Sequence, residues 1–179
     1  MLQVTLTRLL RKVKGKSATA VRIRSASEMS LARRSERPLA CAMLDLDHFK
    51  RINDVHGHPF GDEVLRGVAQ VLMETCRAED VPCRYGGEEF VLLLPNTAAD
   101  GAISLAERIR TAVADFPFTF RRSRVKVTCS IGVADNLHAA NDASILDLAD
   151  GALYRAKQDG RDRAVVAGAE PATATPHAY

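Results

Sequence analysis

Apolar runs with the period of a β-strand occur at five places along the chain. The first, residues 39–46 (LACAMLDL), is almost continuously apolar, which is typical of a strand in the middle of a sheet. Two later runs are separated by Gly86-Gly87, and this dipeptide favours a tight hairpin turn because glycine readily takes positive φ values. The strands predicted by these patterns are residues 39–46, 82–85, 89–94, 126–135 and 164–166.

Apolar residues at helical spacing fill the intervals between these strands. Gly57, Pro59 and Gly61 interrupt the pattern and favour a loop before the helix that contains Val64. We expect Asn96 or Thr97 to cap the next helix. The helices predicted are residues 47–54, 64–76, 98–115 and a last one that begins at Asn141 or Ser144, ends at Gln158 and stops at Gly160.

The order strand, helix, helix, hairpin, helix, strand, helix indicates an α/β (α+β) sandwich, with a central mixed sheet and helices mainly on one face. Residues 39–167 are expected to form the domain. Residues 1–38 are a basic segment that we expect to be partly helical or disordered. Residues 168–179 are rich in Ala, Pro and Thr, and we expect a disordered tail.

Composition and charge are those of an ordinary single globular domain: the 179 residues are 46% apolar and 26% charged. The net charge of +3 hides an asymmetry. Residues 1–38 hold 10 Lys/Arg against 2 Asp/Glu, whereas residues 39–179 hold 15 against 20. The basic start could contact lipid or nucleic acid, or simply be a solvated helix. The acidic body and 5% aromatic content argue against a nucleic-acid platform.

No apolar run reaches the roughly 18 residues of a membrane helix, and no secretory signal is present, so we expect a cytoplasmic protein without a membrane partner. The four cysteines form no C-x-x-C pair and are expected to be buried, reduced thiols. His56 and His58 lie in a glycine- and proline-rich context without soft partners, which is a weak signal for a transition-metal site.

Two carboxylates are the main candidates for chemistry. Asp45 lies at the end of the first strand and Glu88 lies just after the glycine turn, so they meet if the two strands are neighbours. Such a pair suits a hard cation such as Mg²⁺ and metal-assisted phosphoryl transfer. The alternative is that Asp45 caps the next helix and Glu88 is solvated. Lys157 and Arg161 suit either phosphate binding or the dipole at a helix end.

Five motifs in order resemble the GGDEF domain of diguanylate cyclases, a bacterial signalling family. The resemblance covers about residues 39–166 and implies an adenylate-cyclase-like fold, with the signature on the hairpin. It also implies an enzyme, a nucleotidyltransferase that condenses two GTP molecules into cyclic di-GMP and pyrophosphate. The motifs are LDLDHFKRIND, GHPFGDEVL, CRYGGEEFVLLLP, VTCSIGVA and ADGALYRAKQDGR.

The same resemblance implies roles for individual residues. Asp45, Glu88 and the backbone carbonyl of Leu46 match the ligands of Mg²⁺ (or Mn²⁺). Glu88 matches the proposed general base, and Glu89 assists. The positions that match substrate contacts are Asn53 and Asp62 for guanine, His58 as a further contact, Phe49, Lys50, Lys157 and Arg161 near the phosphates, and the signature glycines Gly86 and Gly87.

Regulation and assembly are implied as well. Arg77 and Asp80 form an R-x-x-D motif five residues before the signature, which matches the site where the cyclic di-GMP product inhibits the family, and Arg108 matches a secondary contact. The alternative is a weak ion pair at a helix end. Because each domain holds one GTP, turnover implies an antiparallel homodimer with two-fold symmetry.

The start of the chain departs from the family pattern. The D-x-L-T-G-L-x-N-R-R segment is absent, and the equivalent region reads VRIRSASEMSLARRSERPLA. Nothing before residue 39 is long enough for a sensor domain, so we expect the sensor to be missing from this chain. The alternative function is therefore a weak or inactive module that binds GTP or cyclic di-GMP and signals to a partner.

Overall fold

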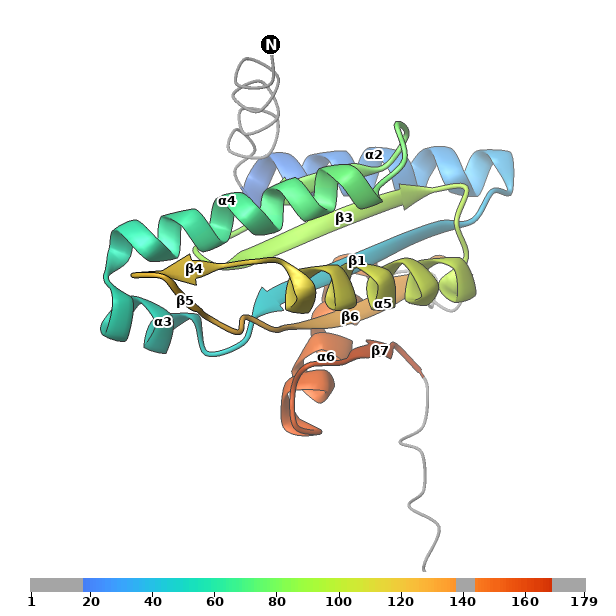
Figure 1. Cartoon of the computed structure of the whole chain (residues 1–179). Coiled ribbons are helices and arrows are strands. Elements are labelled where there is room, and N and C mark those ends of the chain that lie inside the picture. Colours follow the sequence, from blue (N-terminus) through green and yellow to red (C-terminus); the bar gives the residue numbers. More distant parts are fainter. Residues whose placement is uncertain (1–17, 138–143, 169–179) are drawn as a thin grey trace, which may run out of the picture.

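The computed structural model describes residues 18–137 and 144–168, which form a five-stranded sheet flanked by helices (Figure 1). The strand order is β2-β3-β1-β6-β7, and each neighbouring pair is antiparallel except β6 with β7. The mixed central sheet is thus confirmed. Its strands are β1 (Leu39–Leu46), β2 (Val81–Arg84), β3 (Glu89–Pro95), β6 (Cys129–Asp135) and β7 (Ala164–Val166).

The helices cover both faces of the sheet, so the expectation that they pack mainly on one face is wrong. Leu44 and Leu46 of β1 belong to a core formed with three helices, whereas Cys41 and Met43 belong to a second core formed with the other two. A strand buried on both faces reads as a continuous apolar run. The first core includes α3 (Phe49–His56), α4 (His58–Thr75) and α5 (Ala99–Asp115), and the second includes α2 (Ala18–Ser35) and α6 (Ile145–Gln158).

Helix α4 begins at His58, well before Val64, and the loop predicted for this stretch is wrong. Pro59 lies in the first turn, where it removes no intrahelical hydrogen bond. Gly61 makes room for the side chain of Asn53, because a Cβ atom at this position would lie 1.9 Å from Asn53 Oδ1. The glycines and proline therefore permit a close approach of α3 and α4 rather than a loop.

The start of α5 is capped from a distant part of the sequence. Neither Asn96 nor Thr97 caps the helix, since its N-cap residue is Ala98 and no side chain of this segment bonds the first turn. Instead the Ala99 N–H donates to Asp135 Oδ2 at 2.8 Å, and Asp135 is buried at the end of β6. A free helix N–H is thus satisfied by tertiary structure.

Two smaller features complete the fold. A hairpin that the pattern did not predict pairs β4 (Thr119–Phe120) with β5 (Ser123–Arg124). Cys41, Cys83 and Cys129 are buried free thiols as expected, while Cys76 is partly buried. Across residues 18–137 and 144–168, none of the helices combines the length and apolarity needed to cross a membrane.

Some predictions fall outside the described residues. These are the alternative helix start at Asn141, the first 17 residues of the basic segment and residues 169–179 of the predicted tail.

Gly132 offers a test of how α6 packs on β6. A Cβ atom at Gly132 would lie 2.1 Å from both the Ala149 carbonyl oxygen and the Leu153 nitrogen, which are backbone atoms of α6. Since backbone cannot rotate out of the way, Gly132→Ala should push the helix from the sheet. We expect the free energy of unfolding, measured with urea, to fall by about 3 kcal/mol.

Gly151→Ala is the matched control, because Gly151 is exposed on the same helix and its Cβ would have nothing within 4 Å. The better helix propensity of alanine should raise stability by about 0.5–1 kcal/mol. Equal urea midpoints for the unchanged protein and Gly132→Ala would contradict the close packing of α6 on β6.

Candidate active site

The pairing of β1 with β3 brings Asp45 and Glu88 to one edge of the sheet. Asp45 lies opposite Glu89 in the antiparallel ladder, and the Leu46 N–H donates to the carbonyl oxygen of Glu88 at 3.4 Å. Asp45 is only 7% exposed, and Glu88 is partly buried. The two carboxylates come from segments far apart in the chain and meet because of the strand register.

Lys157 is the residue that pairs with Asp45. Its Nζ lies 3.0 Å from Asp45 Oδ2, because the last turn of α6 ends beside the same edge of the sheet. Burial raises the pKa of Asp45, and the hydrogen bond and charge of Lys157 oppose that rise. Asp45 makes no side-chain cap for α3, so the helix-cap alternative is not the observed role.

The donor atoms at this edge fit a hard divalent cation. Burial raises the pKa of Glu88, and repulsion from Asp45 raises it further. A divalent ion would relieve this repulsion, and carboxylate oxygens are ligands that Mg²⁺ prefers. Within residues 18–137 and 144–168, no three His, Cys, Asp or Glu side chains form a group that could hold a metal. Two carboxylates without a neighbouring histidine or thiol suit a hard cation better than zinc.

The turn that carries Gly86 and Gly87 is closed by backbone and by Arg84. The Tyr85 N–H donates to the Glu89 carbonyl oxygen at 2.8 Å, and the Arg84 guanidinium donates to the carbonyl oxygens of Gly86 and Gly87. Neither glycine has a positive φ, so that part of the prediction is wrong. A Cβ at Gly86 would lie 2.4 Å from Glu89 Oε2, whereas Gly87 has open space around it.

The residues that match guanine contacts lie on the packed helices α3 and α4. Asn53 sits where α3 touches Gly61, and Asp62 is exposed on the next position of α4. His58 is exposed at the first residue of α4. Phe49 is 6% exposed, and its side chain packs within the core. His56 packs against Phe60 and Phe120, as an aromatic rather than a ligand.

The positive residues that match phosphate contacts lie in two parts of the chain. Lys50 is exposed at the start of α3, and Arg161 is exposed in the turn after α6. The charge of Arg161 lowers the pKa of Asp45, although burial of Asp45 is the larger influence and acts in the opposite direction. The sheet edge therefore combines two carboxylates with Lys157 and Arg161.

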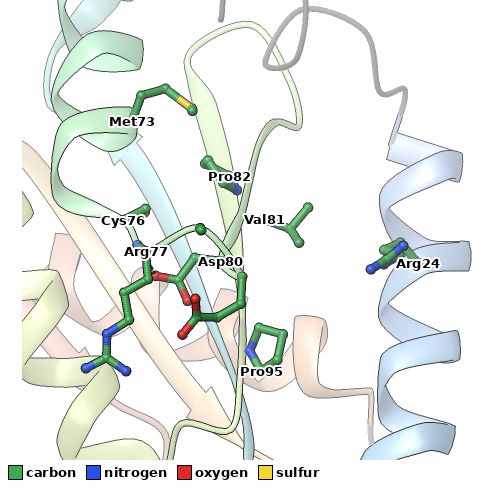
Figure 2. A pocket seen from close by; sticks show the side chains of 10 residues that line it. Arg24, Met73, Cys76, Arg77, Asp80, Val81, Pro82 and Pro95 are labelled. Carbon is green, nitrogen blue, oxygen red and sulfur yellow. Dashed lines mark hydrogen bonds between the residues drawn. The ribbon is translucent and has the colours of Figure 1, made fainter.

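A hollow of about 580 Å³, separate from the sheet edge that carries Asp45 and Glu88, is lined by the residues of the R-x-x-D motif. Figure 2 shows Arg77 and Asp80 on one side of it and Arg24 of α2 on the other. The contact of the Asp80 carboxylate within the motif is not an ion pair with the Arg77 guanidinium. Instead, the backbone N–H of Arg77 donates to Asp80 Oδ2 at 2.7 Å. Arg108 donates to the Thr75 carbonyl oxygen at 3.1 Å, close enough for its charge to act on Asp80.

Sequence patterns missed two residues that shape these sites. Arg84, which binds the carbonyl groups of the glycine turn, lies on β2 two residues before the signature, and only the folded hairpin reveals its role. Arg24 lies in the basic segment, and helix α2 brings it to the hollow around the R-x-x-D motif. No local spacing signal connects Arg24 with Arg77.

Comparison with known proteins gives consistent matches. The family model described as "Diguanylate cyclase, GGDEF domain" matches residues 12–163. Diguanylate cyclase DgcP of Pseudomonas aeruginosa is 45% identical over 142 residues, which are 78% of this chain. Those residues are 21% of DgcP, so the chain spans about a fifth of the length of that relative.

Solved structures show the same fold. The GGDEF domain of DgcB from Caulobacter crescentus in complex with c-di-GMP superposes with a TM-score of 0.80 and 30% identity, covering 88% of this chain and 92% of that chain. The active GGEEF domain of a diguanylate cyclase from Vibrio cholerae superposes with a TM-score of 0.72 and 35% identity, covering 80% and 92%. The expected fold class is confirmed.

The charge of Glu88 should reduce the stability of the metal-free protein. Its pKa is raised in the folded state, so its contribution is most favourable below the unfolded pKa and is lost as pH rises. Glu88→Gln should therefore raise the melting temperature at pH 7, on the order of 1 °C. The difference in melting temperature between the two proteins should vanish below about pH 4, where the Glu88 carboxyl is protonated in both the folded and the unfolded chain. Calorimetry in EDTA measures both values.

Glu63→Gln, at an exposed position of α4, is the control and should leave the melting temperature unchanged at both pH values. A lower melting temperature for Glu88→Gln at pH 7 would mean that this carboxylate stabilises the fold, contrary to the repulsion inferred from its surroundings.

Proposed function

This chain belongs to the GGDEF family of diguanylate cyclases, and from that membership we propose that it condenses two GTP molecules into cyclic di-GMP with release of pyrophosphate. The observation that supports the activity is the pair of carboxylates, Asp45 and Glu88, held at one sheet edge beside Lys157. The active GGEEF domain of a diguanylate cyclase from Vibrio cholerae carries the same signature sequence. Since GTP is a cytoplasmic nucleotide, the reaction belongs to the cytoplasm.

Glu88 would act as the general base on the 3′-hydroxyl of one GTP, and its raised pKa suits a group that must accept a proton. The hydroxyl oxygen attacks the α-phosphorus of the other GTP, and pyrophosphate leaves with the bonding electrons. The reciprocal attack by the 3′-hydroxyl of the second nucleotide closes the ring and releases a second pyrophosphate. Asp45, Glu88 and the Leu46 carbonyl would hold Mg²⁺ or Mn²⁺, which when bound neutralises charge on the phosphates. Glu89 stands next to this set and would support it.

Substrate binding would use the surrounding helices. Asn53 and Asp62 would bind the guanine edge, whose N–H donors suit a carboxylate acceptor, and His58 would add a contact. Lys50, Lys157 and Arg161 would bind the phosphates together with the backbone at Phe49. Gly87 leaves open space where a nucleotide could approach the turn between Gly86 and Glu88.

Two chains would have to meet for turnover, because each would hold one GTP. An antiparallel homodimer with two-fold symmetry satisfies this requirement. Arg77 and Asp80 would bind the cyclic di-GMP product at the hollow around the R-x-x-D motif, with Arg108 as a neighbouring contact, and the bound product would hold the domains apart. That the GGDEF domain of DgcB was solved in complex with c-di-GMP supports product binding in this family.

A binding module without turnover is the second candidate. The Lys157–Asp45 ion pair favours it, because an ion held by Asp45 must compete with the lysine. Such a module would bind GTP or cyclic di-GMP and release no pyrophosphate.

The proposed activity predicts cyclic di-GMP, identified by mass spectrometry, when concentrated protein is incubated with GTP and Mg²⁺. The rate should grow with the square of the protein concentration while dimers are scarce. Glu88→Gln removes the base and should lower the rate by at least about 100-fold, and Asp45→Asn should lower it similarly. Glu63→Gln is the control on α4. GTP binding without product, even in an enforced dimer, would favour the binding module.

Product binding predicts a different variant phenotype. Arg77→Ala removes a guanidinium that can stack on and hydrogen-bond guanine, so calorimetry should show at least tenfold weaker binding of cyclic di-GMP. The rate with GTP at low product concentration should not change. Arg66→Ala, an exposed change on α4, should leave cyclic di-GMP binding intact. Unchanged binding by Arg77→Ala would exclude the R-x-x-D motif as the inhibitory site.

A further inference from the structure

Helix α2 contacts the residue that comes just before the glycine turn. The guanidinium of Arg22 donates to the hydroxyl oxygen of Tyr85 at 3.2 Å, across 63 positions of sequence. Tyr85 follows β2 directly and precedes Gly86, and its ring packs against the second core. The proposed reaction gives no role to either Arg22 or Tyr85.

The backbone of Tyr85 closes the hairpin that carries Glu88. Its N–H donates to the Glu89 carbonyl oxygen at 2.8 Å, and the Gly86 N–H donates to the same oxygen at 3.3 Å. Because these two bonds set where the chain turns, a shift of Tyr85 would also shift Glu88 on the other side of the turn. The side chain that Arg22 holds therefore belongs to the residue that closes the turn.

Glu88 is held loosely by the rest of the sheet. The Leu46 N–H of β1 reaches the Glu88 carbonyl oxygen at 3.4 Å, which is long for a hydrogen bond. Arg84 supports the turn from within the hairpin, through the carbonyl oxygens of its two glycines. A Cβ atom at Gly87 would have nothing within 4 Å, so packing does not restrain that part of the turn. A contact from outside the hairpin can thus decide where Glu88 lies.

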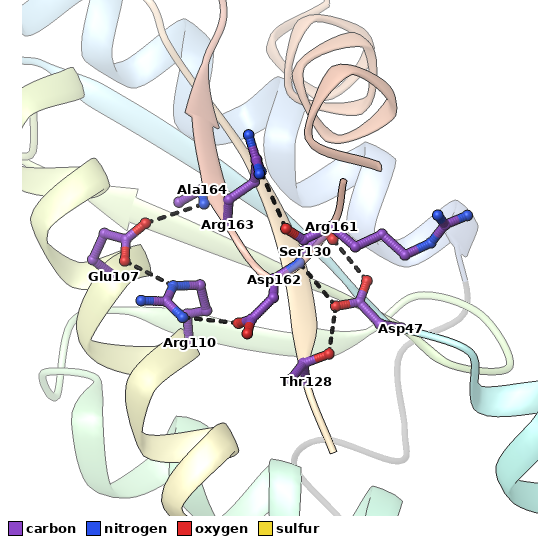
Figure 3. Close-up of polar contacts among 9 residues, drawn as sticks. All are labelled: Asp47, Glu107, Arg110, Thr128, Ser130, Arg161, Asp162, Arg163 and Ala164. Atoms are coloured by element: carbon purple, nitrogen blue, oxygen red, sulfur yellow. Dashed lines mark hydrogen bonds and ion pairs between the residues drawn. The ribbon is translucent and has the colours of Figure 1, made fainter. Parts of the chain in front are cut away.

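The end of α6, on the other side of the reacting edge, is held by the sheet itself. The Asp47 carboxylate accepts from the hydroxyls of Thr128 and Ser130 at 2.8 and 2.7 Å. It also accepts from the Asp162 N–H at 3.1 Å, which ties the turn after α6 to β1 (Figure 3). The helix end that carries Lys157 therefore depends on the sheet, whereas the glycine turn has a link to α2.

Helix α2 rests on the sheet through a narrow face. Over residues 21–35 the buried positions are Val21, Ser25 and Ala32, and two of these side chains are small. Small side chains bury little apolar area, so this face alone fixes the helix weakly. The hydrogen bond of Arg22, next to Val21, therefore adds a specific tether between α2 and the turn.

We infer that Arg22 is a positioning residue for the reacting edge. It holds Tyr85, and through Tyr85 it sets the place of the glycine turn and of Glu88. The position of α2 is thereby linked to the separation of the Glu88 and Asp45 carboxylates. Only the consequence of this link for the reaction rate rests on the proposed function.

Amide hydrogen exchange of the full chain, resolved by NMR, tests the link without turnover. Arg22→Ala should speed exchange of the Gly86 N–H about fivefold, as expected for the loss of one exposed hydrogen bond to a charged group. Tyr85→Phe removes only the hydroxyl and should have the same effect. Exchange of the Leu92 N–H, inside β3, should not change, because it reports unfolding of the sheet.

Arg34→Ala is the matched control and should leave exchange at Gly86 unchanged. Arg34 is an exposed arginine of the same helix, and it also donates to a hydroxyl, that of Ser30, at 3.1 Å. Faster exchange at Gly86 and Leu92 alike would mean that the Arg22–Tyr85 contact stabilises the whole fold, which would overturn the inference.

The double variant Arg22→Ala/Tyr85→Phe tests whether the two residues act through one contact. Its effect on exchange at Gly86 should be no larger than that of either single change. Arg22→Lys keeps a donor for the hydroxyl and should restore most of the protection. Effects of the two single changes that simply multiply in the double variant would overturn the inference.

The rate at saturating GTP gives the functional readout. Arg22→Ala should lower kcat about threefold and change KM for GTP less than about twofold, because the proposed guanine and phosphate contacts lie on α3, α4 and the end of α6. An unchanged kcat would overturn the inference and leave the proposed function intact. A chain that shows the exchange effects but makes no cyclic di-GMP would refute the proposed function and leave the positioning role of Arg22 standing.

Discussion

The antiparallel register between β1 and β3 sets Asp45 opposite Glu89 and so brings Glu88 beside Asp45. A slip of one residue would turn every side chain of β1 to the other face of the sheet. Register is firmly specified here because β1 is buried on both faces: Leu44 and Leu46 pack against one core, and Cys41 and Met43 against the other. The position of the candidate site therefore follows from the packing of the whole sheet.

The same edge is electrostatically unfavourable when it holds no ligand. Burial and mutual proximity raise the pKa of Glu88, and burial raises that of Asp45, so the fold concentrates negative charge where water is scarce. Lys157 offsets part of this charge from the end of α6. A cation arriving with a nucleotide would offset more. Such local strain is expected at functional sites, where stability and activity favour different residues.

Much of the fold could be predicted from sequence periodicity. The strand at residues 39–46 and the short strand at 164–166 were predicted with the bounds observed, because apolar runs and their flanking residues are local signals. The wrong predictions concern positions whose local structure depends on residues far away in the sequence. Gly61 read as a helix breaker because its contact with Asn53 is invisible in one dimension, and Asp135, not Asn96 or Thr97, satisfies the start of α5.

The candidate site divides in the same way. Asp45, Glu88 and the glycine turn were predicted as candidates from motif spacing, since they lie within continuous segments of recognisable pattern. The partners that position the site were not. Lys157 was predicted near phosphates, yet its ion pair with Asp45 joins residues on β1 and α6. Asp47 organises the turn at Arg161 through bonds across 81 to 115 positions of sequence, a range that no local pattern reports.

The most direct measurement of the central claim is a crystal structure of the protein with Mn²⁺ and a non-hydrolysable GTP analogue, with the metal located by anomalous scattering. The account predicts one Mn²⁺ between the carboxylates of Asp45 and Glu88, with Lys157 Nζ moved away from Asp45 Oδ2. Anomalous density elsewhere, or bound nucleotide with Lys157 still paired to Asp45 and no metal at Glu88, would contradict it.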